Sequence, residues 1–275
     1  PDFGPATARA AFLVTPEGFA RAEESAQDNR YMAAAGYHAE AALAEHRALQ
    51  RALSADVPVF AFPGDPATPD AVFPNNVFAI ARPDAQVLPQ APPRLLVGRM
   101  RHAVRQAEAA RADIRGFFRD TAGAVEIDLS QQPHPCELTG SLVIDRARGL
   151  GFCGLSERCD EAGAALMHEA FGLRATLLFD LAAGEYHTNV VLAVLAGRAV
   201  LVSPAGFAEP AVAQAIAGLY APHAVLLEPH QQAAFAANAI ALSPRRVWMS
   251  AVAAASLDPA RVQALARAGF ELGQV

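Results

Sequence analysis

The feature of this sequence that most constrains its fold is a pattern that returns about every 45–55 residues. In each copy, short apolar runs flank a tight turn that contains Arg or Gly, and a helical segment and a further apolar run follow. The clearest copy predicts strands over 141–145 and 150–153, a helix over 157–172 begun by a Ser156 cap, and a strand over 173–179. The pattern therefore predicts a chain built from ββαβ units.

Four further copies follow the same order, two of them less regularly. Their expected elements are strand 10–14, helix 39–53 and strand 57–62; strands 76–81 and 86–88, helix 99–115 and strand 124–128; strands 189–195 and 199–203, helix 209–220 and strand 224–228; strands 238–242 and 247–250 and helix 258–268. Repeats of this length are typical of propellers and solenoids, and the helices exclude an all-β propeller. We therefore expect an α/β fold, a five-unit ββαβ propeller with pseudo-fivefold symmetry.

A three-layer α/β sheet is the competing architecture. It fits less well, because the paired strands of each unit read as antiparallel ribbons rather than βαβ crossovers. No Gly- or Ser-rich linker interrupts the chain, so we expect residues 1–275 to form a single α/β-propeller domain. A Pro-rich stretch over 86–93 reads either as a flap over a site or as an ordinary turn.

Composition excludes several classes of function. The net charge is −6 and all 22 basic residues are Arg, so the chain has no lysine for a Schiff base and no strong cationic character for nucleic acids. A GxGxxG pattern is absent, which argues against a nucleotide cofactor, and the spacing of the Cys and His residues fits no metal site. Apolar stretches stay short of the ~18 residues of a membrane helix, and we expect no secretory signal. With three cysteines, the sequence favours a reducing, cytoplasmic location.

Polar side chains gather just before the first strands of successive units. They are Asn75, Asn76, Glu137, His187, Asn189 and Asn238. Since equivalent positions in a ring of units face a common axis, we expect these groups to converge on one central pocket. A carboxylate, an imidazole and amides that meet in a buried place are costly without a ligand. The pattern therefore indicates a binding or catalytic site.

The motifs at these positions resemble those of a known superfamily. FPNN at 73–76, ELTGS at 137–141 followed by LVIDR, LSER at 155–158 and YHTNV at 186–190 stand in the order and spacing of the guanidino-group-modifying superfamily. That superfamily includes arginine deiminases, dimethylarginine dimethylaminohydrolases and amidinotransferases. The resemblance is closest to the amidinotransferase-like citrulline-utilisation hydrolase branch, and it runs from Phe12 to Gln274. It implies a five-unit α/β propeller that needs no cofactor and acts on a small arginine-like substrate.

The resemblance also implies roles for individual residues. Glu137 matches the Glu that binds the guanidinium group and His187 matches the acid–base His, so these two are the expected catalytic residues. The expected substrate-binding residues are Asp70, Phe73, Asn75, Asn76, Arg99, Arg158, Asn189 and Asn238. Among these, Arg158 and Arg99 match positions that bind a substrate α-carboxylate. Asn75 and Asn76 stand where many relatives carry carboxylates, and their neutral amides favour a neutral or weakly basic group, as in citrulline or an N-substituted arginine.

The expected nucleophile lies beyond the last residue, Val275. In the family a Cys thiolate attacks the guanidinium carbon, and this Cys follows the fifth unit in a Gly-rich segment. Cys136, Cys153 and Cys159 match no such position. Three functions therefore stay open: a hydrolase whose Cys follows Val275, a binding protein without the thiol, and an amidinotransferase. The oligomeric state stays open too, a dimer included.

Overall fold

The computed structural model of the protein describes residues 6–20, 22–27, 29–31, 38–82 and 91–275. Within this part of the chain the strands form five small sheets, each made from neighbouring stretches of sequence. Sheet by sheet, the strands are β1 (Ala11–Val14) and β2 (Val59–Phe62); β3 (Phe78–Ala81), β4 (Arg94–Val97) and β5 (Val125–Asp128); β6 (Leu142–Asp145), β7 (Leu150–Leu155) and β8 (Ala175–Asp180); β9 (Leu192–Leu195), β10 (Ala199–Val202) and β11 (Ala224–Leu226); β12 (Arg246–Met249) and β13 (Glu271–Gln274).

The three middle sheets share one topology. In each, the first two strands pair antiparallel, and the third strand lies parallel to the second on its other side. Helices α6 (Glu161–Phe171) and α7 (Pro210–Leu219) make the crossovers of two of these sheets. The first and fifth sheets hold two parallel strands each. The protein is therefore a mixed α/β fold of several small sheets, and the ββαβ pattern is realised in full in the middle three.

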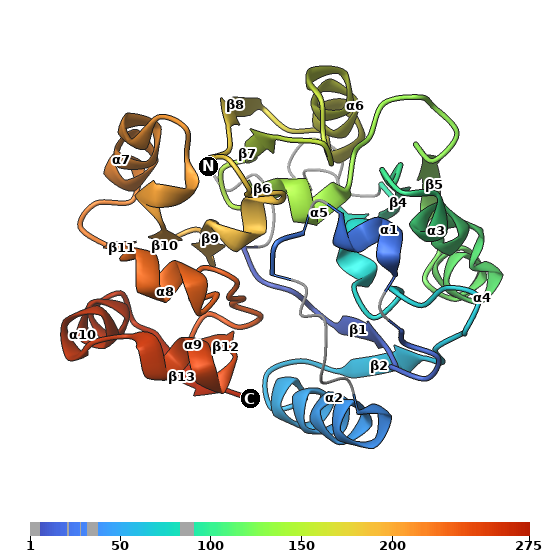
Figure 1. Cartoon of the computed structure of the whole chain (residues 1–275), viewed down its shortest axis with the longest axis horizontal. Coiled ribbons are helices and arrows are strands. Elements are labelled where there is room, and N and C mark those ends of the chain that lie inside the picture. The colour runs from blue at the N-terminus through green and yellow to red at the C-terminus, as the bar shows by residue number, and fades with distance from the viewer. Residues whose placement is uncertain (1–5, 21, 28, 32–37, 83–90) are drawn as a thin grey trace.

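The helices lie mainly outside the sheets. Figure 1 shows the sheets following one another around the middle of the molecule, with α2 (Ala39–Leu53), α4 (Ala112–Gly116), α6, α7 and α10 (Pro259–Arg267) at the periphery. The remaining helical segments are α1 (Glu23–Ala26), α2 (Ala39–Leu53), α3 (Ala103–Gln106), α4 (Ala112–Gly116), α5 (Leu138–Ser141), α8 (Pro229–Ala233), α9 (Ala251–Ser256) and α10 (Pro259–Arg267), the 3₁₀ turns η1 (Pro74–Asn76), η2 (Ala107–Ala110), η4 (Thr188–Val190) and η5 (Pro204–Gly206), and the π-helical turn η3 (Phe117–Thr121). None of the helices in the described ranges has the length and apolar character to cross a lipid bilayer.

Helix α6 shows how the apolar pattern builds the core. Asp160 caps its start by accepting a hydrogen bond of 2.7 Å from the Gly163 N–H, and Gly172 ends it in the left-handed conformation, with φ of 65°. The face between these ends packs Met167 and Phe171 into a cluster with Leu142 and other buried residues of the second and third sheets. Met167 is fully buried, and burying a side chain of this size contributes ~1.5–3 kcal/mol.

The helix predicted over 99–115 is wrong as a single element. The chain forms three short turns instead, α3, η2 and α4. Arg111 interrupts them with a ψ of 94°, and its guanidinium donates to the carbonyl of Pro63 and to the carboxylate of Asp113. Arg99 is extended, because its backbone bridges to Cys136. Tertiary partners therefore override the local preference for helix.

Other differences lie at the edges of units. Helix α6 begins four residues later than predicted, at Glu161, because residues 156–159 form a turn closed by hydrogen bonds between Ser156 and Cys159. The strand predicted over 238–242 is wrong, since only Ile240 pairs, with Trp248. The strand predicted over 86–88 and most of the 86–93 stretch lie outside the described residues, and β4 at 94–97 pairs with β3. The polar strand β13 had no apolar signal in the sequence.

The first and fifth sheets are neighbours in space. Leu53 and Val57 from the first unit form one apolar cluster with Leu242 and Trp248 from the last. Beside this cluster, Asp56 accepts a 2.5 Å hydrogen bond from the Trp248 indole and lies 3.3 Å from the guanidinium of Arg246. The first and last units are therefore held against each other.

Candidate active site

Short helical turns stand before the first strands of the three middle sheets. η1 precedes β3, α5 precedes β6 and η4 precedes β9. Glu137 and His187 are the residues immediately before α5 and η4. Because α5 packs against both η1 and η4, the polar residues of three sheets are brought together toward the middle of the molecule (Figure 1).

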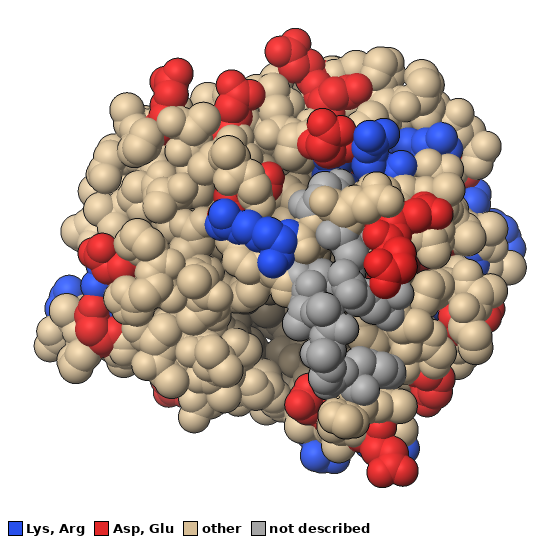
Figure 2. Space-filling view, in the orientation of Figure 1, with Lys and Arg blue, Asp and Glu red and all other residues tan. Residues whose placement is uncertain are grey.

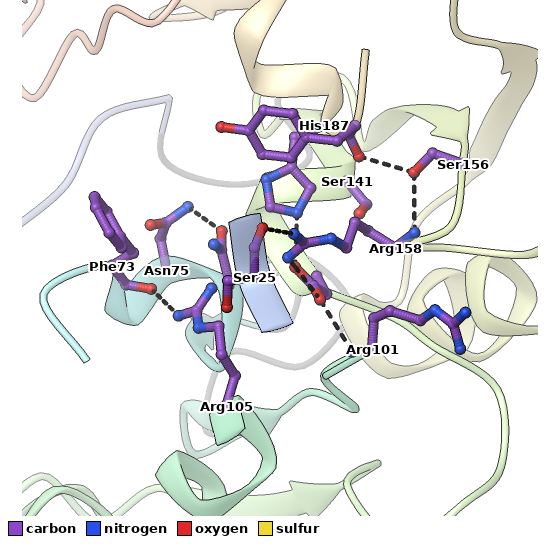
Figure 3. Close-up of polar contacts among 12 residues, drawn as sticks. Ser25, Phe73, Asn75, Arg101, Arg105, Ser141, Ser156, Arg158 and His187 are labelled. Atoms are coloured by element: carbon purple, nitrogen blue, oxygen red, sulfur yellow. Dashed lines mark hydrogen bonds and ion pairs between the residues drawn. The ribbon is translucent and has the colours of Figure 1, made fainter. Parts of the chain in front are cut away.

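A buried Glu–His pair lies at this meeting point. The Nε2 atom of His187 donates a 2.8 Å hydrogen bond to Oε2 of Glu137, and the two side chains are 3% and 0% exposed. The other oxygen, Oε1, accepts a 3.0 Å hydrogen bond from the backbone N–H of Arg101. The guanidinium of Arg158 lies 3.3 Å from Oε2 (Figure 3). The carboxylate is therefore held from three sides.

The surroundings keep Glu137 ionised. Burial alone would raise its pKa, but the hydrogen bond from His187 and the positive charges of Arg158 and Arg105 outweigh burial and lower the pKa to about 2. Burial lowers the pKa of His187, against the opposing effect of Glu137, so the imidazole is neutral near pH 7. An ionised carboxylate can only accept, so Nε2 carries the proton and Nδ1 is left for proton exchange.

Gly140 allows the ring of His187 and the side chain of Asn76 to approach α5. A Cβ atom on Gly140 would lie 3.0 Å from Nδ1 of His187 and 2.5 Å from Oδ1 of Asn76. Any larger residue would displace one of them, which explains the Gly in the ELTGS motif. Thr188 adds a 2.5 Å hydrogen bond to the carbonyl of Ser141, which fixes η4 against α5.

The two adjacent amides form one hydrogen-bonded unit. Nδ2 of Asn75 donates to Oδ1 of Asn76 at 2.9 Å, and the carbonyl of Asn75 accepts from Thr139 at 3.0 Å. Asn76 is buried beside Gly140, whereas Asn75 is partly exposed. Phe73, just before them, is 45% exposed and packs edge-on against Phe19. The loop thus presents amides next to the His187 ring.

Asp70 is buried with one oxygen left free. Its Oδ2 accepts a 2.7 Å hydrogen bond from the Ser25 hydroxyl, and its Oδ1 has no hydrogen-bond partner in the described part of the chain. The carbonyl of Ser25 in turn accepts a 3.2 Å hydrogen bond from Arg158 (Figure 3). Oδ1 of Asn189 is also buried and without a partner among the described residues. Two buried oxygens are therefore available to accept N–H groups.

The two arginines expected to bind a carboxylate are placed differently. The Arg158 side chain is 3% exposed and is engaged by Glu137 and Ser25, so in this structure it balances the charge of the carboxylate. The Arg99 side chain has a different partner: it donates to the Ser130 carbonyl at 2.9 Å, and Arg99 lines a cavity of about 230 Å³. Asn238 is exposed and donates to the carbonyl of Asn189 at 3.1 Å.

Sequence reasoning missed two residues of this site, Ser25 and Arg105. Ser25 lies in the short helix α1 (Glu23–Ala26), where the sequence predicted no element, and it carries no sequence signal. Arg105 stands three residues before Glu108 on a predicted helix, a spacing that favours an ion pair and could have marked it.

Figure 2 shows a hollow near the middle of the face seen in Figure 1.

The three cysteines are buried and unsuited to attack a substrate. Sγ of Cys153 lies 3.7 Å from Sγ of Cys159, and Sγ of Cys136 accepts from the backbone N–H of Arg99. Burial raises the pKa of Cys136 to about 11, and the contact with Cys153 together with burial raises that of Cys159. A nucleophilic cysteine needs the opposite, a lowered pKa and an accessible thiolate. Among the described residues no three His, Cys, Asp or Glu side chains gather as metal ligands.

Comparison with protein families decides the assignment of the chain. A family model described as "N,N dimethylarginine dimethylhydrolase, eukaryotic" matches residues 15–273. The chain belongs to this family. The dimethylarginine dimethylhydrolases are hydrolases of amidine C–N bonds in arginine derivatives, which agrees with the guanidino-group-modifying superfamily predicted from the motifs. A search of the curated proteins found no match.

Solved structures show the same fold. The N-terminal domain of ArgZ, an arginine dihydrolase from the ornithine–ammonia cycle in cyanobacteria, is 18% identical with a TM-score of 0.78, and the match covers 96% of this chain and 90% of that domain. The match covers 37% of full-length ArgZ. The dimethylarginine dimethylhydrolase of Pseudomonas aeruginosa, solved as a Cys-to-Ser mutant with citrulline, is 20% identical with a TM-score of 0.70, and the match covers 98% and 92% of the two chains.

Proposed function

We propose that the protein hydrolyses guanidino or ureido C–N bonds of arginine-related metabolites through a Cys–His–Glu mechanism with a covalent thiouronium intermediate. The observation that carries this proposal is the buried hydrogen bond between Glu137 and His187, with the Asn76 side chain packed against the same Gly140 as the His187 ring. His187 is the proposed acid–base group, Glu137 orients it, and the nucleophile is a cysteine that follows Val275. Membership of the dimethylarginine dimethylhydrolase family supports this reaction class.

The ligand proposed for this site is flat and rich in N–H donors. A guanidinium group presents its N–H bonds in one plane, and oxygens that only accept are its natural partners. Oδ1 of Asp70 and Oδ1 of Asn189 are such oxygens, buried and without partners among the described residues. The amides of Asn75 and Asn76 offer donors as well as acceptors, which suits an N-substituted arginine or the ureido oxygen of citrulline.

In the proposed reaction, His187 accepts and returns one proton in each half. The neutral imidazole takes the proton of the thiol, and the thiolate sulfur bonds to the guanidinium carbon. His187 then gives this proton to the leaving amine as the C–N bond breaks. A water molecule attacks the thiouronium carbon and passes one proton to His187. The C–S bond then breaks, the departing thiolate takes this proton back from His187, and the hydroxyl proton of the adduct goes to solvent as the C=O bond of the ureido product forms. The negative charge of Glu137 stabilises the imidazolium in both halves.

Two further points belong to the same proposal, one on the architecture and one on the branch of the superfamily. We propose that the five sheets close into a single ring-shaped domain around the site. The cluster of Leu53, Val57, Leu242 and Trp248, with the Asp56–Trp248 hydrogen bond, supports closure, because it joins the first unit to the last. Assignment to the citrulline-utilisation branch within the superfamily stays a prediction from the sequence motifs.

The test is an assay of the protein together with whatever residues follow Val275. Amine release and ureido product are measured with arginine and N,N-dimethylarginine, with and without an acceptor amine, so that transfer is told apart from hydrolysis. His187→Ala should lower turnover by about 10²–10⁴-fold, the usual size of acid–base catalysis. His134→Ala is the matched control, because His134 is half exposed and pairs with Asp160 away from Glu137. Unchanged turnover in His187→Ala would contradict the proposal.

A non-catalytic arginine-binding protein is the second candidate, favoured by the burial of all three described cysteines. Mass spectrometry after treatment with a haloacetamidine separates the two candidates. A label on a cysteine beyond Val275 supports the hydrolase. An unlabelled protein that binds citrulline supports the binding protein.

A further inference from the structure

We propose that the cavity beside Arg99 is a second binding site, for a small oxyanion such as the carboxylate or phosphate group of a metabolite. The cavity has a volume of about 230 Å³, and Arg99, Gln106 and Gln131 are among the residues that line it. Its lining includes neither Glu137 nor His187, so it is distinct from the candidate active site. The assignment gives Arg99 a role different from the substrate contact predicted from the motifs, and it does not depend on the proposed function.

The guanidinium of Arg99 has no carboxylate partner in the described part of the chain. Its NH1 nitrogen donates a 2.9 Å hydrogen bond to the carbonyl of Ser130, a neutral acceptor, and the other two nitrogens have no partner among the described residues. A guanidinium is always charged and presents its N–H bonds in a planar fork. The two nitrogens that Ser130 leaves open can therefore make the two-pronged contact that a carboxylate or a phosphate accepts.

The acidic side chains close to the cavity in sequence are engaged elsewhere. Asp128 accepts a 2.8 Å hydrogen bond from the backbone N–H of Ser130 and pairs with Arg115 at 2.8 Å. Glu108 pairs with Arg105 at 2.8 Å. Neither carboxylate therefore serves as the counter-ion of the Arg99 guanidinium, and the positive charge is available to an anion from solution.

Neutral amides add further donors to the cavity lining. The side chain of Gln106 donates to the carbonyl of Met100 at 3.0 Å, and that of Gln131 donates to the hydroxyl oxygen of Ser130 at 3.0 Å. Since a side-chain amide nitrogen carries two N–H bonds, each glutamine keeps a second donor. None of the described residues that line the cavity is acidic. The lining therefore suits a ligand that accepts hydrogen bonds and carries negative charge.

The backbone joins this cavity to the candidate active site. The N–H of Cys136 donates to the carbonyl of Arg99 at 2.9 Å, and the N–H of Arg99 donates to Sγ of Cys136 at 3.4 Å. Two residues further along, the N–H of Arg101 donates to the carboxylate of Glu137. An anion held by the Arg99 side chain should steady this stretch, so we expect slower amide hydrogen exchange at residues 99–101 when the anion is bound.

Calorimetry with separate titrations of inorganic phosphate and malonate tests the site, in a buffer that holds no other oxyanion. We expect saturable binding, and the tighter of the two ligands tells phosphate from carboxylate chemistry. Arg99→Gln should weaken the binding at least about tenfold, because it removes the charge-assisted contact. Arg94→Gln is the matched control and should leave affinity unchanged, because Arg94 also donates to a backbone carbonyl, that of Ala170 at 3.1 Å, but does not line the cavity.

Gln131→Glu provides a second variant if Arg99→Gln does not fold. Gln131 is exposed, so a change of its side chain should leave the fold intact. The new carboxylate repels an anion and offers Arg99 an internal partner in its place. We expect the same weakening of phosphate or malonate binding as in Arg99→Gln.

The outcomes that would overturn the proposal are specific. A parent protein that binds neither phosphate nor malonate has no such site. Parent-like affinity in Arg99→Gln or in Gln131→Glu would show that the anion binds elsewhere, and unchanged exchange at residues 99–101 would show the same. Since none of these measurements needs turnover, the result stands whether or not the protein hydrolyses arginine derivatives.

Discussion

At the scale of single residues, the site depends on one buried negative charge. Glu137 is fully buried, yet its carboxylate is ionised because His187, the Arg101 N–H and Arg158 surround it. Removing one partner of such a cluster leaves an uncompensated buried charge, which is strongly destabilising. The charge of Glu137 is therefore tied to the stability of the fold as well as to the site.

Acid unfolding should report this charge directly. The pKa of Glu137 in the folded protein, about 2, lies below its usual value, so between about pH 5 and 2 the unfolded chain binds more protons than the folded one. Stability should therefore fall with falling pH across this window, by roughly 3 kcal/mol from this group. Urea unfolding at several pH values should show a shallower slope in Glu137→Gln. Parallel slopes in parent and variant would contradict the assignment.

At the scale of elements, capping decides where the third unit places its site residues. Asp160 stops α6 from extending backwards and leaves residues 156–159 free to form the turn that carries Arg158. The sequence predicted a cap at Ser156, whereas the cap in the structure is Asp160. The hydroxyl of Ser156 donates to the Tyr186 carbonyl instead of capping the helix, so the helix begins after Asp160.

Substitution of this cap should have a modest and specific effect. Asp160→Ala removes the acceptor for the Gly163 N–H and should lower the free energy of unfolding by about 1 kcal/mol. Asp160→Asn keeps a capping oxygen and should stay within a few tenths of a kcal/mol of the parent. Urea unfolding near pH 7 measures both. Equal losses in the two variants would show that the cap is not what Asp160 supplies.

At the scale of the whole molecule, the contact between the first and fifth sheets holds segments far apart in the chain. Asp56 binds both the indole of Trp248 and the guanidinium of Arg246. The contact sits beside an apolar cluster, where an unpaired indole N–H costs about 1–3 kcal/mol. It is the point at which the proposed ring would close.

Breaking this contact should loosen the first and fifth sheets together. Asp56→Ala should lower the free energy of unfolding by about 1–3 kcal/mol and speed amide exchange in β1, β2, β12 and β13. Asp56→Asn, which retains an acceptor for Trp248, should lose less. If exchange rises in only one of the two sheets, the sheets do not stabilise each other.

The sequence by itself determined most of the order of elements and singled out Glu137 and His187, the pair at the centre of the candidate site. Apolar period and turn chemistry are local, so the third and fourth ββαβ units and helix α2 could be predicted from short windows. The repeat also marked Glu137 and His187, because equivalent positions in equivalent units face the same place.

Only the tertiary structure decided what these residues touch. The pairing of Arg158 with Glu137, the bridge that Ser25 makes between Asp70 and Arg158, and the position of Arg105 join segments from different units. The broken helix over 99–115 has the same origin, since Arg111 reaches Pro63 across the fold. Such contacts depend on burial and direction in three dimensions, which no local window of sequence contains.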